Sequence, residues 1–311
     1  MSWSHLVAAY DLLDDPAVRG ESVAAHLRAI DPEVDVEVDV VAGDGGETDF
    51  VRVRIAGTDG KAGGGSAPTL GILGRLGGLG ARPEQIGFVS DGDGALAAVA
   101  IAAKLLAMGR RGERLPGDVI VATHIDPDAP TQPHDPVPFM GSVVAQSTSN
   151  AHEVTDEMDA ILSIDTTKGN RICNAKGIAI TPTIVDGWIL RVSESLLDVV
   201  SRSTGRPPVV MPITMQDITP YGNGVYHVNS LVQPATATAV PVVGVAIVAE
   251  TAVPGSATGA TDLHDVEQAV RFAIEVAKDF GRGIARFHDD EQLALLQEQY
   301  GSMAHLRVLR D

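Results

Sequence analysis

The chain has 311 residues, with 41 acidic against 23 basic side chains and a formal net charge of −18. Nucleic acids and anionic membranes bind basic surfaces, so this balance argues against both as partners. The acidity has two interpretations, a solubilising surface or carboxylates gathered around a cation.

Cysteine content and the N-terminus give expectations about the compartment. Cys173 is the only cysteine, which excludes an internal disulfide and fits a reducing cytoplasm. The first residues, "MSWSHLVAAYDLLDD", lack a basic region followed by a long apolar run, so we expect no signal peptide. We also find no run of about twenty apolar residues and expect no membrane span.

The first 67 residues predict two helices and an antiparallel strand pair. Residues 4–16 and 20–31 have helical patterns, and the second helix ends before Pro32. Residues 33–41, "EVDVEVDVV", alternate as a half-buried strand does, and 49–57 repeat the alternation with arginines outward. We expect this pair at one edge of a sheet.

Residues 68–283 predict the core of a single α/β domain. Continuous apolar runs at 69–73, 117–123, 159–164 and 239–249 are bounded by Gly, Pro or Asp. Strands covered on both faces have this composition, so a mostly parallel central sheet is expected. Between them, 94–109 is apolar nearly all round and predicts a buried helix, while 193–205 and 262–281 predict amphipathic helices.

Two further segments bear on assembly. Residues 284–311 predict a C-terminal helix that packs on the body or on a partner subunit. Residues 208–234 are rich in Val, Met and Tyr and predict either a symmetric interface or a wall of the active site. A homo-oligomer is therefore expected.

Polar residues follow the apolar runs at the point where each predicted strand ends. They are Asp91 and Asp93, His124 with Asp126 and Asp128, Asp165, and Glu250. Ligands of open α/β sheets bind outside the carboxyl ends of the strands, so these groups converge if the strands are parallel. Each also has a structural interpretation: a helix cap for Asp91 or Asp93, a turn for Asp165, a core histidine for His124 and a loop carboxylate for Glu250.

A proline-rich segment follows one of these strands directly. "THIDPDAPTQPHDPVPFMGS", residues 123–142, interleaves five prolines with two histidines and three aspartates. Proline disfavours helix and stiffens the loop, so His134 would be held without a helix. The alternatives are a loop that supplies metal or substrate ligands, and a loop that covers the sheet edge or forms a subunit contact.

The order of these motifs resembles the core of the co-catalytic zinc aminopeptidases of the glutamyl/leucyl type, over about residues 68–280. Residues 123–142 resemble still more closely the signature THxxPxAPTQPHxPVPFMGS of a bacterial and archaeal family of unknown function. The resemblance implies a three-layer, phosphorylase/hydrolase-like α/β sandwich. It also implies that Asp91 matches the metal-bridging aspartate and Asp165 the carboxylate of the second metal.

Three ligand positions of the peptidases lack a ligand here. "LGRLGGLG" (73–80) stands where they have His-x-Asp, "HIDPDA" (124–129) where they have two glutamates, and "AVPGSATGAT" (252–261) where they have their last histidine. Their inserted second domain is also missing. These departures exclude an unmodified two-zinc aminopeptidase.

The first functional hypothesis is a metal-dependent hydrolase acting on a C–N bond of a small amide or peptide-like molecule. Asp91, His124 and Asp165 would bind Zn²⁺, Mn²⁺ or Co²⁺, with His134 or Asp126 completing the shell. Asp126 or Asp128 would accept the proton of a metal-bound water. The alternatives are a catalytically degenerate peptidase-fold protein that binds a small ligand or partner, and a metal-free acid–base enzyme.

Overall fold

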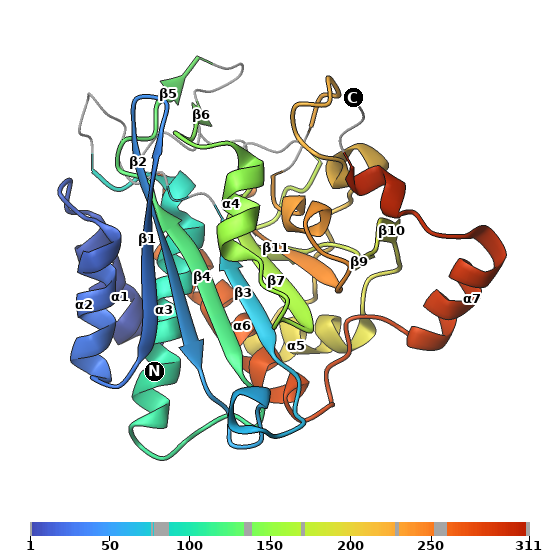
Figure 1. Cartoon of the computed structure of the whole chain (residues 1–311), viewed down its shortest axis with the longest axis horizontal. Helices are drawn as coiled ribbons and strands as arrows, with labels where there is room; N and C mark the ends of the chain where they lie inside the picture. The colour runs from blue at the N-terminus through green and yellow to red at the C-terminus, as the bar shows by residue number, and fades with distance from the viewer. Residues whose placement is uncertain are drawn as a thin grey trace.

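The computed structural model describes residues 2–75, 77, 87–133, 139–168, 172–227, 230–251 and 260–308. Within them the chain forms a mixed α/β fold around a nine-stranded sheet, with a separate two-stranded sheet of β5 (Thr131–Gln132) and β6 (Phe139–Met140). Helices cover both faces of the large sheet (Figure 1).

The centre of the sheet is parallel, as the sequence predicts. Its strands are β4 (Val119–Ile125), β3 (Leu70–Gly74), β7 (Ala160–Thr166) and β11 (Val242–Val248), in that spatial order. Each neighbouring pair among them is parallel. Their carboxyl ends therefore lie at one edge, where the polar residues were expected to converge.

The outer strands are antiparallel. β1 (Asp35–Gly43) and β2 (Gly46–Ile55) form the predicted pair, and β2 joins the core along β4. On the other side lie the short strands β8 (Gly177–Ile180), β9 (Ile184–Val185) and β10 (Trp188–Ile189). The sheet is therefore mixed around a parallel centre.

One face of the sheet is covered by long apolar helices. α3 (Asp93–Gly109) packs on β3, β4 and β7, and α6 (Leu263–Phe280) packs on α3 and β11. Around them lie α1 (Trp3–Leu13), α2 (Gly20–Ile30) and α5 (Glu194–Thr204). Their buried Val, Leu, Ile and Ala side chains form the larger core.

The helix Ser90–Gly109 is long and apolar enough to cross a membrane, contrary to our count of apolar runs. Most of its length is buried within the fold, and a core helix of a soluble protein passes the same test. The expectation that membranes are not partners therefore stays a prediction.

The opposite face carries a smaller core and α4 (Gln146–Glu153), which packs on β2 and β4. Figure 1 shows α4 in front of the sheet, with α3 and α6 behind it. α4 lacks an apolar stripe, so the sequence pattern does not predict it.

The tail departs from prediction. A helix over 284–311 was expected, but α7 covers only Asp290–Tyr300. The Asp289 side chain caps it by accepting the backbone N–H groups of Glu291 and Gln292, and Gly301, with φ +80°, ends it. α7 stands away from the body (Figure 1).

Candidate functional site

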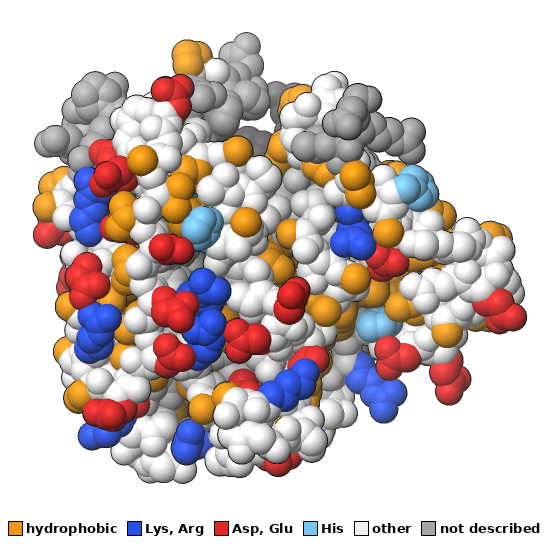
Figure 2. All heavy atoms as spheres, viewed as in Figure 1, with side chains coloured by type: hydrophobic (Ala, Val, Ile, Leu, Met, Phe, Trp, Pro, Cys, Tyr) orange, Lys and Arg blue, Asp and Glu red, His pale blue; other side chains and the backbone are white. Residues whose placement is uncertain are grey.

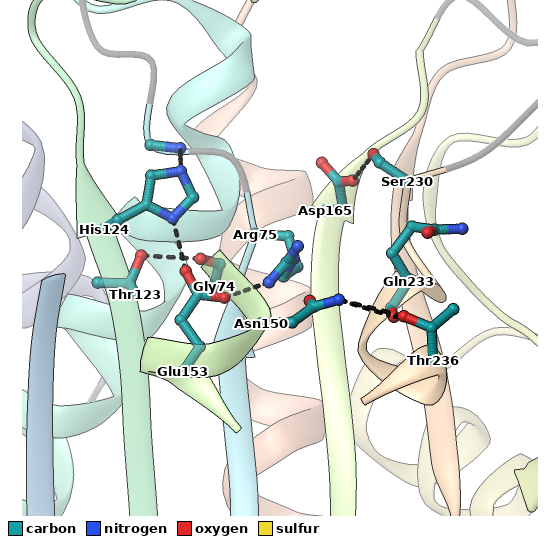
Figure 3. A network of polar contacts seen from close by, with 11 residues as sticks. Gly74, Arg75, Thr123, His124, Asn150, Glu153, Asp165, Ser230, Gln233 and Thr236 are labelled. Carbon is teal, nitrogen blue, oxygen red and sulfur yellow. Dashed lines mark hydrogen bonds and ion pairs between the residues drawn. The ribbon is translucent and has the colours of Figure 1, made fainter. Parts of the chain in front are cut away.

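Three polar side chains lie side by side at the carboxyl edge of the parallel strands. The register pairs Gly74 with Thr123 on one side and with Ile164 on the other. The next positions, His124, Arg75 and Asp165, are therefore level across β4, β3 and β7. All three are buried on the face that α4 covers (Figure 3).

His124 is held between a backbone amide and a carboxylate. Its Nε2 accepts the N–H of Gly77 at 3.0 Å, and its Nδ1 lies 2.5 Å from Oε1 of Glu153 at the end of α4. The ring is therefore neutral with its hydrogen on Nδ1. Gly77 is required here because a Cβ would lie 1.8 Å from the carbonyl oxygen of His124.

Glu153 also pairs with the guanidinium of Arg75, through Nη1. Burial by itself would raise the pKa of Glu153, but Arg75 and then His124 outweigh it and hold that pKa below its usual value. Glu153 is thus an ionised carboxylate that binds both neighbours.

The remaining edge of Arg75 has no protein partner in the described part of the chain. Nε and Nη2 are buried without a hydrogen bond, and the side chain has no solvent exposure. The helix α3 begins directly behind this residue, since a Cβ on Gly94 would lie 2.3 Å from the carbonyl oxygen of Arg75.

Asp165 faces away from this ion pair. Its Oδ1 accepts the backbone N–H of Thr166 at 2.7 Å, and its Oδ2 accepts the hydroxyl of Ser230 at 2.6 Å. Burial raises the pKa of Asp165 to about 7, although the Ser230 hydrogen bond and Arg75 act in the opposite direction. A carboxyl with this pKa can both give and accept a proton near neutrality.

Asp126 and Asp128, the predicted proton acceptors, are separated. Asp126 is buried near His124, and its backbone N–H donates to the Gly77 carbonyl at 2.8 Å. Burial raises the pKa of the Asp126 carboxyl. One of its oxygens accepts from Ser142 and Val143, and the Thr48 side chain also interacts with this carboxyl. Asp128 instead lies by Arg19 and the β1–β2 turn.

Asp91 and Asp93 lie at the start of α3. Asp91 is buried in the turn Ser90–Gly92 that contacts β7. Asp93 does not cap the helix, since it binds Lys168 at 2.6 Å and the Thr261 hydroxyl at 2.7 Å. Burial raises the pKa of Asp93 despite this ion pair.

The described residues do not fit a metal ion. No group of three or more His, Cys, Asp or Glu side chains among them could hold one, and His134 lies outside them. Strand spacing puts the Cα atoms of His124 and Asp165 roughly 10 Å apart. Arg75 lies between them, and both His124 nitrogens and both Asp165 oxygens already have hydrogen-bond partners.

Comparison with known structures defines the class of fold. The chain is similar to the crystal structure of an Acidobacteriales bacterium glutaminyl cyclase, with TM-score 0.50, 14% identity, and coverage of 91% of this chain and 94% of that one. At this identity the likeness shows the fold alone, a mixed α/β fold. No curated protein matches the chain.

The family is shown by sequence. A family model described as "Protein of unknown function (DUF1177)" matches residues 39–310, and the chain belongs to that family. This confirms the expected resemblance to a family of unknown function, while the signature at residues 123–142 stays a prediction.

The sequence analysis missed Arg75, Glu153, Lys168 and Ser230. Arg75 did carry a signal, since it is a lone charge in the apolar, glycine-rich run 69–80. The resemblance to the peptidases predicts this stretch only as an empty ligand position. Glu153 had no such signal, because α4 is polar throughout and lies far from Arg75 in the sequence.

Proposed function

We propose that this chain is a peptidase-fold protein, with a three-layer hydrolase-like architecture, that binds a small molecule without a catalytic metal. The observation that carries the proposal is the buried guanidinium of Arg75 between His124 and Asp165. A metal shared by those two residues would have to take the place of a fixed positive charge.

The positive charge of Arg75 disfavours a metal at this position. At about 4 Å and an effective dielectric of about 20, two unit charges interact by about 4 kcal/mol, and a divalent ion doubles this. This repulsion is an upper bound, because the ion pair of Arg75 and Glu153 is neutral in sum. Glu153 offsets part of it, but its two oxygens already serve Arg75 and His124.

The ligand is assigned to this edge for a topological reason. Open α/β sheets bind their ligands outside the carboxyl ends of the parallel strands. Here the edge also holds two buried nitrogens without a protein partner in the described part of the chain, Nε and Nη2 of Arg75. Buried polar atoms in native proteins almost always have a partner, so these two mark where a ligand or water binds.

The second candidate is the metal-dependent hydrolase of a C–N bond. It is favoured by Asp91 and Asp165, which are both buried near the strand edge in the positions that the peptidase resemblance assigns. In that case Asp126, with its raised pKa, is the better proton acceptor, because Asp128 is paired with Arg19 at the surface.

Metal analysis separates the two candidates. The protein is purified without chelators, incubated with Zn²⁺, Mn²⁺ or Co²⁺, desalted and measured by elemental analysis. We expect no stoichiometric metal and no change in melting temperature with EDTA. About one ion per chain, lost in Asp91→Ala or Asp165→Ala but kept in the exposed control Asp44→Ala, would establish the second candidate instead.

A turnover assay complements the metal analysis. Small amides and dipeptides, including D-residue substrates, are incubated with the wild type and with Asp126→Asn. We expect no hydrolysis. Hydrolysis by the wild type that disappears in Asp126→Asn would show an active hydrolase.

A further inference from the structure

We propose that the small molecule bound at this edge carries a carboxylate group, which the Nε–Nη2 edge of Arg75 holds through two parallel hydrogen bonds. This rests on the proposed ligand-binding function and adds the chemical class of the ligand.

Among the described residues, the Arg75 guanidinium has a protein partner on one side only. Nη1 binds Glu153, while Nε and Nη2 are buried and have no partner in the described residues. A buried donor left unsatisfied destabilises the fold, and more so when it is charged. The two atoms are the side edge of the guanidinium, whose parallel N–H groups match the two oxygens of a carboxylate.

The protein does not fill this edge with a carboxylate of its own, although one is near. Asp165 is level with Arg75 on the adjacent strand, yet no ion pair joins these two described residues. Asp165 is turned to Thr166 and Ser230 instead. Figure 3 shows Arg75 between Glu153 and Asp165, with its only drawn contact to Glu153.

The guanidinium is also held in a fixed orientation. Glu153 binds it through one oxygen and is itself fixed through the other by His124. Behind it, the backbone N–H of Arg75 donates to the Ile164 carbonyl at 2.7 Å. Because the side chain is already ordered, a ligand loses little of its binding free energy to ordering it.

Charge favours a carboxylate over a phosphate. The buried pair of Arg75 and Glu153 is neutral in sum, and Asp165 and Asp126 lie at the same edge. Burial raises the pKa of Asp165 to about 7, which reduces its negative charge near neutrality. A planar monoanion is tolerated there, whereas a phosphate with nearly two negative charges adds more repulsion and needs more donors.

The test compares acids with their amides on the full-length wild type. The probes are N-acetyl amino acids, the matching N-acetyl amino acid amides, succinate and inorganic phosphate. Binding is measured by calorimetry and by the ¹⁵N–¹H signal of the Arg75 Nε–H group, assigned with Arg75→Lys. We expect acids to shift that signal and to bind at least about tenfold more tightly than amides, since charged bonds exceed neutral ones by about 1.4 kcal/mol.

Substitutions of Arg75 test its role in binding, and a second variant covers the case in which the first does not fold. Arg75→Lys keeps the charge but loses the side edge, and it should weaken acid binding at least about tenfold, whereas the surface control Arg54→Lys should not. If Arg75→Lys does not fold, the double variant Arg75→Met with Glu153→Met removes both buried charges together, a change that proteins tolerate well. It should also lose the preference for acids.

The outcomes distinguish this inference from the proposed function. Equal binding of acids and amides, an Arg75 signal that no acid moves, tighter binding of phosphate, or no binding by any probe each overturns the carboxylate assignment. None of these places a metal at the edge. Stoichiometric metal overturns the proposed function itself, and that result comes from the separate elemental analysis.

Discussion

At the residue scale, the buried acids at the strand edge are stabilised in two different ways. Glu153 stays ionised because a guanidinium and an imidazole N–H both bind it. No Lys or Arg among the described residues forms an ion pair with Asp165, and burial raises its pKa to about 7. The two acids therefore contribute to stability with opposite dependence on pH.

Replacing Asp165 by Asn isolates this dependence. A folded-state pKa raised from the unfolded value of about 3.9 to about 7 gives a stabilising contribution that is complete below pH 4 and lost as the pH rises through 7. The neutral Asn keeps both hydrogen bonds, because its oxygen accepts from Thr166 and the Ser230 hydroxyl can turn to accept its amide. The variant should therefore lose less stability than the wild type over this window.

The measurement is urea unfolding at pH values from 4 to 8. The free energy of unfolding of Asp165→Asn minus that of the wild type should rise with pH, by at most about 4 kcal/mol. Asp265→Asn is a useful comparison, since burial and then Asp262 raise the pKa of Asp265 to about 6 and its difference should level off earlier. Parallel curves for Asp165→Asn and wild type would show that the Asp165 pKa is not raised.

The sequence predicts some residues of the candidate site and not others. His124 and Asp165 follow apolar runs directly, so sequence order alone predicts them at the ends of buried strands. The importance of Arg75 depends on Glu153, which is 78 residues away in sequence. No local pattern connects two such residues, and the pair becomes visible only when α4 lies on the sheet.

At the element scale, the long helices and inner strands were predictable because each repeats one pattern over many residues. α3 and α6 begin and end within a residue or two of the predicted limits, and the parallel centre follows from the continuous apolar runs. The strands β8, β9 and β10 have four residues or fewer. Only their pairing partners stabilise strands this short, so local sequence does not predict them.

Close packing of α3 on the strand ends makes a second prediction. An added Cβ on Gly94 would lie 2.3 Å from the Arg75 carbonyl oxygen and 2.6 Å from that of Ile164, so β3 or β7 must shift. Gly94→Ala should destabilise the fold by about 1–3 kcal/mol, the usual cost of overpacking, and displace Arg75. Chemical denaturation measures the loss.

The matched control lies on the same helix. A Cβ on Gly109 meets nothing within 4 Å, so Gly109→Ala should be neutral or stabilise the protein by up to about 1 kcal/mol. If Gly94→Ala is as stable as Gly109→Ala, then α3 does not press on the strand ends as described.

At the scale of the whole molecule, the excess negative charge does not form one patch on the face shown in Figure 2. Lys and Arg side chains there lie beside Asp and Glu. Arg54, for example, pairs with both Glu37 and Glu157. This distribution agrees with the interpretation of the acidity as a soluble, mixed surface.

The C-terminal helix α7 is the element on which we base the expectation of a homo-oligomer. α7 has 11 residues and none of them is buried, yet helices shorter than about 12–15 residues are marginal alone in water. Leu293 and Leu296 line a groove of about 550 Å³ between α7 and the start of α5, and Leu295 and Tyr300 are 51% and 66% exposed. A second copy of the chain that covers α7 would supply the missing contacts.

We therefore expect the wild type to have a solution mass that is a multiple of the 32.4 kDa of one chain, measured by light scattering after gel filtration. Leu295→Glu should shift it to a single chain, because a buried unpaired carboxylate is far more costly in an interface than at the surface. Gln297→Glu, at an exposed polar position of the same helix, should leave the assembly unchanged. A wild type that stays at 32.4 kDa at every concentration would show that α7 is not covered by another copy.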